Sequence, residues 1–116
     1  YFGKLNKQTL VKVYNAADML LAPSLHEGFG MTLLEAMACG TPVITANVSA
    51  MPEVVGDAAV LVEPMDFQAI ASTVCRLQND SAYRQQLVAL GLKRAKSFTW
   101  ENTARQIADV YERAIA

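Results

Sequence analysis

Short apolar runs alternate along the chain with longer stretches in which apolar residues recur every three or four positions. The short runs are Met19–Ala22, Pro42–Thr45 and Ala59–Val62, and continuous apolar runs of this length are typical of strands buried on both faces. The longer stretches have the spacing of amphipathic helices. Because strands joined by helical crossovers pair in parallel, the pattern predicts an α/β fold. We expect one domain over residues 1–116, with a Rossmann-like parallel sheet of about three to four strands and helices on both faces.

Capping residues and helix breakers place the predicted helices more closely. The spacing predicts one helix between Asn6 and Ala17 and another over Met31–Cys39, and the second is followed by the helix-breaking residues Gly40 and Pro42. A short helical turn is expected from Pro52 to Gly56. Three further helices are predicted to begin after the capping residues Asp66, Asp80 or Ser81, and Thr99. Gly91 lies inside one of them, where it weakens the helix and indicates a close contact.

The loop after the first predicted strand is the main candidate for a binding site. Open α/β sheets bind ligands at the carboxyl ends of their strands, and this loop runs from Ser24 to Gly30 into the helix that starts near Met31. Gly28 and Gly30 allow backbone conformations closed to other residues and let a ligand approach the main chain. The free amides of the helix start favour a phosphate. A plain tight turn explains the same two glycines equally well.

Two carboxylates flank this turn. Glu27 precedes it and Glu35 lies eight positions later, on the order of 10 Å away if most of the interval is helical. An extended diphosphate could place its pyrophosphate at the helix start, with one hydroxylated end near each carboxylate. A carboxylate beside an anomeric carbon would also stabilise oxocarbenium charge. Alternatively, Glu27 is a solvated loop acid and Glu35 only complements the helix dipole, which is worth about 0.3 to 1 kcal/mol. Phe29 fits a core position better than a base-stacking position.

Composition narrows the possible partners. Ten Lys and Arg residues against eleven Asp and Glu give a net charge of −1, so no broad positive field favours nucleic acid or an anionic membrane. Cys39, Cys75 and His26 form no metal-binding spacing, and the two cysteines fit a reduced compartment. No run approaches the roughly 20 apolar residues of a membrane span. We expect a cytoplasmic protein, either free or peripheral to the membrane in its full-length form. Because the chain begins with Tyr1 rather than Met, we expect it to be a fragment.

The motif around the two carboxylates resembles a known family signature. Residues 27–44 read EGFGMTLLEAMACGTPVI, which resembles the E-x7-E signature of the family 4, or group 1, retaining glycosyltransferases of the GT-B fold. Other segments resemble the usual flanks of this signature, so that the resemblance covers essentially the whole chain. These segments are Tyr14–Asp18, Ala22–Leu25, Pro52–Ala59 and Phe98–Trp100.

The resemblance implies a fold, an activity and a role for each site residue. The chain would be the latter part of the C-terminal, donor-binding domain of an enzyme that transfers a hexose-type sugar from a nucleoside diphosphate to an acceptor with retention of anomeric configuration. Glu27 matches the first motif carboxylate, which lies by the donor sugar and is the expected catalytic residue. Glu35 matches the second, which binds the ribose hydroxyls. The residues that match the loop and helix start facing the donor sugar and phosphates are Gly28, Phe29, Gly30, Met31 and Thr32.

The resemblance also implies that parts of the enzyme lie upstream of Tyr1. These parts are the Arg and Lys pair that neutralises the donor phosphates, the base-binding loops and the N-terminal domain that binds the acceptor, a sugar or lipid-linked glycan. We therefore expect the isolated chain to bind a UDP-, GDP- or ADP-sugar weakly at best and to transfer nothing. The resemblance implies no metal ion and no cofactor. Two alternatives remain: a module that binds a nucleotide or nucleotide sugar without chemistry, and a domain whose 31–39 helix only packs on the sheet.

Overall fold

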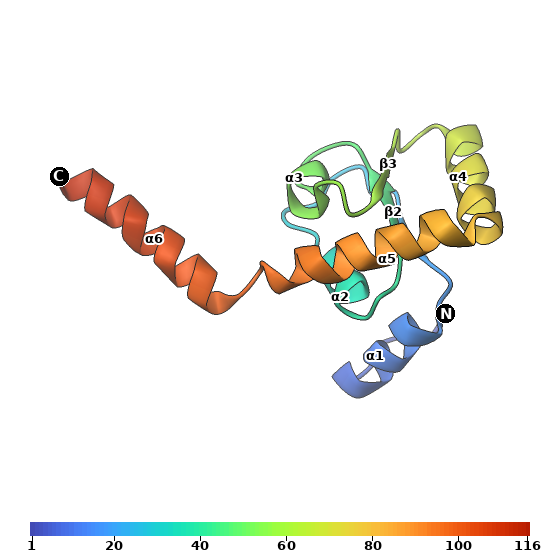
Figure 1. The fold of residues 1–116 in the computed structure, drawn as a ribbon, viewed down its shortest axis with the longest axis horizontal. Coiled ribbons are helices and arrows are strands. Elements are labelled where there is room, and N and C mark those ends of the chain that lie inside the picture. Colours follow the sequence, from blue (N-terminus) through green and yellow to red (C-terminus); the bar gives the residue numbers. More distant parts are fainter.

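A computed structural model describes residues 1–116 as a three-stranded parallel sheet with helices packed around it (Figure 1). The sheet order is β1-β2-β3, with Leu20 opposite Val43 and Ile44 opposite Val60. The predicted parallel α/β architecture is confirmed. In chain order the elements are α1 (Lys7–Ala16), β1 (Leu20–Ala22), α2 (Met31–Ala38), β2 (Val43–Ala46), α3 (Met51–Val55), β3 (Val60–Val62), α4 (Phe67–Asn79), α5 (Ser81–Lys96) and α6 (Trp100–Ile115).

The central strand β2 joins two apolar clusters on opposite faces of the sheet. All four β2 residues are buried, and successive side chains of a strand point to opposite faces. Val43 packs in a cluster with residues of α2 and α3, whereas Ile44 packs with Val62, Leu77 of α4 and Leu87 of α5. Helices therefore cover both faces, and the short strands are the ones that their continuous apolar runs predict.

Predicted caps are present at four helices. The side chains of Asn6, Asp66, Asp80 and Thr99 each accept a hydrogen bond from the amide three residues later. Asp80 rather than Ser81 caps α5. The close contact expected at Gly91 is also present, because a Cβ atom there would lie 3.2 Å from the Met37 Cγ atom of α2.

The last helix differs from the others in having no buried residue. In Figure 1 it extends away from the rest of the chain after α5, and the overall dimensions are 53 × 32 × 30 Å. None of the helices has both the length and the apolar character needed to cross a membrane.

Candidate functional site

The glycine loop connects the carboxyl end of β1 to the start of α2, as the sequence predicts. Gly30 precedes α2 in the left-handed conformation, with φ +95°, and a Cβ atom there would meet the Leu33 side chain at 3.0 Å. Glycine is therefore needed at this position. Gly28 has no left-handed backbone, and a Cβ atom there would meet nothing within 4 Å. The expectation of a special backbone is thus right for Gly30 and wrong for Gly28, which instead leaves open space beside the loop.

No side chain caps the N-terminus of α2. This helix differs in that respect from α1, α4, α5 and α6, whose caps each satisfy an N-terminal amide. The first residues of α2, Met31 and Thr32, are exposed. Unsatisfied amides at a helix start point outward with the positive end of the helix dipole, which is the arrangement that binds phosphate groups.

Glu27 is held by two serines from different loops. The Ser24 hydroxyl donates to Glu27 Oε1 at 3.1 Å. The Ser49 hydroxyl, from the loop between β2 and α3, donates to the Glu27 carbonyl oxygen at 2.8 Å and lies 3.4 Å from the Glu27 amide nitrogen, from which it accepts. Ser49 is the one residue other than glycine with a positive φ, +57°. The loops at the ends of β1 and β2 are therefore joined at Glu27.

The same serine also contacts the neighbouring histidine. The Ser49 hydroxyl lies 3.2 Å from His26 Nδ1. One serine side chain therefore contacts both the backbone of Glu27 and the ring of His26.

Glu35 lies in the second turn of α2 and has a different partner. It is half-buried, and the Tyr14 hydroxyl of α1 donates to Glu35 Oε2 at 3.1 Å. Burial, followed by the neighbouring Glu35 carboxylate, raises the pKa of Tyr14 to about 12. The Thr41 hydroxyl donates to the Tyr14 carbonyl oxygen at 2.7 Å. The two carboxylates thus share no partner: neighbouring loops hold Glu27, and an adjacent helix holds Glu35.

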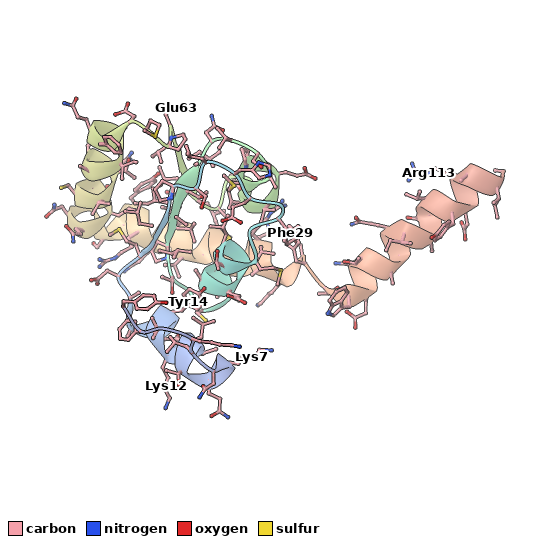
Figure 2. The ribbon with its side chains drawn as sticks, turned by 180° about the vertical axis from the view of Figure 1, so that it is seen from behind. Lys7, Lys12, Tyr14, Phe29, Glu63 and Arg113 are labelled. Carbon is pink, nitrogen blue, oxygen red and sulfur yellow. The ribbon has the colours of Figure 1, made fainter.

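An open hollow of about 790 Å³ lies beside α2, between this helix and the junction of α5 and α6. The Phe29 ring lies on its wall and packs edge-to-face on Phe98, with 6.0 Å between ring centroids. Because 44% of Phe29 is exposed, the core position considered for it is wrong. Figure 2 shows Phe29 close to the end of α5, at the side of the chain from which α6 departs. Met31 and Glu35 also line the hollow.

The structure therefore places all seven candidate residues on one loop and the helix that follows it. These residues are Glu27, Gly28, Phe29, Gly30, Met31, Thr32 and Glu35. No three His, Cys, Asp or Glu side chains are close enough together to hold a metal ion.

Two residues that organise the site were not identified from sequence. Tyr14 occupies an apolar position of the α1 stripe, and only its hydroxyl could have indicated a polar partner on the facing helix. Ser49 has no distinguishing signal, because a serine in a loop of small residues does not predict a positive φ. Both contacts join segments more than twenty residues apart, so neither follows from local sequence.

The chain is similar in sequence to known glycosyltransferases. A sequence model described as "Glycosyl transferases group 1" matches residues 1–94. The chain is 41% identical over 112 residues to the O-antigen chain mannosyltransferase B of Escherichia coli, covering 97% of this chain and 29% of that protein. It is 42% identical over 105 residues to a D-inositol 3-phosphate glycosyltransferase of Streptosporangium roseum, covering 89% of this chain and 24% of that protein. The chain thus spans less than a third of the length of these relatives.

Solved structures agree with this similarity. A sucrose-phosphate synthase from Thermosynechococcus elongatus superimposes with a TM-score of 0.83 at 34% identity, over 97% of this chain and 29% of that one. The C-terminal domain of a group 1 glycosyl transferase from Francisella tularensis superimposes with a TM-score of 0.70 at 32% identity, over 84% of this chain and 50% of that one.

Proposed function

The chain belongs to the group 1 glycosyltransferase family, and from this we propose that it supplies the donor-binding half of an enzyme that transfers a hexose-type sugar. The donor would be a nucleoside diphosphate sugar, and the transfer would retain the anomeric configuration. The acceptor, a sugar or lipid-linked glycan, would bind to a part of the protein outside these residues. Two relatives are named as mannosyltransferases, so GDP-mannose is the first donor to test. UDP-glucose and ADP-glucose are tested with it.

One observation carries the proposal: the uncapped start of α2 lies between two carboxylates that are each held by a hydroxyl group. A nucleoside diphosphate sugar has its groups in a matching order, with the transferred sugar at one end, two phosphates in the middle and the ribose of the nucleoside at the other end. Carboxylates accept hydrogen bonds from sugar hydroxyls, and helix amides bind phosphate. No metal ion or cofactor is needed in this scheme.

Each site residue then has a definite role. Glu27 is the proposed catalytic residue, because a carboxylate beside the anomeric carbon stabilises positive charge as the bond to the leaving phosphate breaks. The amides of the loop and of the first turn of α2 stabilise the negative charge that develops on the phosphate. Glu35 binds the ribose hydroxyls. Gly28, Phe29, Gly30, Met31 and Thr32 form the surface along which the donor lies.

The experiment compares Glu27→Gln with Glu35→Gln in the full-length enzyme. We expect Glu27→Gln to lower kcat about 100- to 1000-fold with little change in donor KM, because it removes charge stabilisation from the transition state. We expect Glu35→Gln to raise donor KM about tenfold with little change in kcat. Initial rates with GDP-mannose, UDP-glucose and ADP-glucose identify the donor and give both constants.

A matched control is Glu112→Gln on α6, an exposed residue outside the site, which should leave both constants unchanged. Equal losses of kcat and KM in both site variants would contradict the division of roles. A wild-type protein that binds one of these donors but neither transfers nor hydrolyses it would support the alternative of a non-catalytic binding module.

A further inference from the structure

The Tyr14 side chain meets the proposed ribose-binding carboxylate from a separate helix. Its hydroxyl is the only protein group that hydrogen-bonds the Glu35 carboxylate, at 3.1 Å from Oε2. The two residues lie 21 positions apart, one in the last turn of α1 and the other in the middle of α2. Figure 2 shows Tyr14 on the side of α1 that faces the body of the chain, with Lys7 and Lys12 on other sides.

Tyr14 is itself fixed at both ends. Only 8% of the residue is exposed, and it packs in the cluster formed with α2, β2 and α3. The Thr41 hydroxyl holds the Tyr14 carbonyl oxygen at 2.7 Å, which ties the end of α1 to the turn after α2. Because Tyr14 is held in this way, its hydroxyl has little freedom to follow the Glu35 carboxylate if the carboxylate moves. The hydroxyl therefore defines one rotamer of Glu35 rather than adapting to several.

We propose that Tyr14 is a positioning residue that holds Glu35 Oε2 and thereby directs Glu35 Oε1 to the ribose of the donor. This inference rests on the proposed function. An ionised carboxylate accepts about four hydrogen bonds, so the single bond from Tyr14 leaves room for both ribose hydroxyls. Fixing a long acidic side chain before the donor arrives lowers the conformational entropy lost on binding.

The polarity of the contact suits this role at neutral pH. Burial and the neighbouring carboxylate raise the pKa of Tyr14 to about 12. The phenol consequently keeps its proton at neutral pH, so its hydroxyl remains able to donate to Glu35 Oε2. The contact orients the carboxylate without taking part in proton transfer.

The test is Tyr14→Phe in the full-length enzyme, which keeps the buried ring and removes only the hydroxyl. We expect donor KM to rise about 3- to 10-fold and kcat to stay within about twofold, as for the loss of one hydrogen bond that acts in binding. The donor is whichever of GDP-mannose, UDP-glucose and ADP-glucose the wild type uses. The matched control is Tyr83→Phe on α5, a half-buried tyrosine whose hydroxyl makes no hydrogen bond, and it should change neither constant.

Two further measurements separate positioning from simple anchoring of α1. In a Glu35→Ala background, Tyr14→Phe should change donor KM by less than twofold, because the hydroxyl then has no carboxylate to position. This double-mutant cycle isolates the part of the Tyr14 effect on donor binding that depends on Glu35. With a donor analogue whose ribose lacks both the 2′- and 3′-hydroxyls, Tyr14→Phe should also have less than a twofold effect. A structural role would instead raise KM equally with either donor and in either background, and this outcome would overturn the proposal.

The remaining outcomes distinguish the inference from the function on which it rests. If Glu35→Ala raises donor KM but Tyr14→Phe does not, the positioning role is wrong and the ribose-binding role of Glu35 stands. If neither variant changes donor KM, the proposed function of Glu35 is wrong, and the inference is overturned with it.

Discussion

The helices α5 and α6 have 16 residues each and follow one another directly, yet they differ completely in burial. Leu87 and Gly91 of α5 are buried, and the helix packs along α2 and against α4. No residue of α6 is buried, although its apolar residues form the cleaner stripe: Trp100, Ile107, Val110, Tyr111 and Ile115. Figure 1 shows α5 lying across the body and α6 extending away from it. An amphipathic pattern therefore predicts that a helix exists and has an apolar side, but it does not predict what that side contacts.

The packing of α5 depends on features that an apolar stripe does not describe. Gly91 lets α5 approach Met37 of α2 closely. Near its end, Arg94 donates to the carbonyl oxygens of Glu53 and Val54 at 2.6 and 2.8 Å, which stabilises the C-terminal end of α3. The guanidinium group also lies 5.0 Å from the centre of the Phe98 ring. Gly91 and Arg94 thus contribute to the packing of α5 against α2 and α3. The hydrophobic pattern alone would attribute this packing to the leucines of α5.

The largest expected effect comes from truncating a large apolar side chain in each of these helices. Leu87→Ala should lower the free energy of unfolding by about 3 to 4 kcal/mol, because it leaves a cavity among tightly packed side chains. Leu87 is 4% exposed, whereas Ile107 of α6 is 51% exposed. Ile107→Ala should therefore change the unfolding free energy by no more than about 0.5 kcal/mol. Urea unfolding of the 116-residue chain measures both, and equal losses would show that the two helices are packed alike.

The helix α1 lies between these extremes, since Tyr14 is its only buried residue, and its attachment should depend on pH. The pKa of Tyr14 is raised from 10.0 to about 12 in the folded chain. Below pH 10 the phenol is protonated in both states, and its contribution to stability is fully present. Between pH 10 and 12 the unfolded chain loses this proton first, which favours unfolding. The contribution should fall by about 1 to 3 kcal/mol over that interval, because water near the phenol oxygen screens part of the effect.

The measurement is the unfolding free energy of wild type and of Tyr14→Phe between pH 8 and 12. Lysine, cysteine and other tyrosine side chains ordinarily ionise in this range as well, so the informative quantity is the difference between the two proteins. The wild type should lose stability relative to Tyr14→Phe as the pH rises above 10. Parallel curves would mean that the Tyr14 proton is no more tightly held in the folded chain than in the unfolded one.

The sequence predicts more of the fold than of the site. The three apolar runs, the four side-chain caps and the motif loop are local features, and local spacing is sufficient to place them. The contacts of the two carboxylates are not local. Ser49 reaches Glu27 through a backbone conformation that serine rarely adopts, and Tyr14 reaches Glu35 across two packed helices. Such contacts depend on how the sheet brings its loops and helices together, and no window of sequence contains both partners.

The smallest expected effect concerns Gly91, where helix propensity and packing act in opposite directions. Alanine is favoured over glycine inside a helix by about 1 kcal/mol, so Gly91→Ala should stabilise α5 if its surroundings were open. A Cβ atom at this position would lie 3.2 Å from Met37 Cγ and 3.6 Å from Met37 Cα, so α2 or the Met37 side chain must move. We expect the cost of this overpacking to exceed the gain in propensity, with a net loss of about 1 kcal/mol.

The control is Ala89→Gly at an exposed position of the same helix, which should also cost up to about 1 kcal/mol through propensity alone. Urea unfolding should therefore show that opposite substitutions two residues apart both destabilise the chain, and a stabilised Gly91→Ala variant would mean that α5 does not depend on close approach to α2.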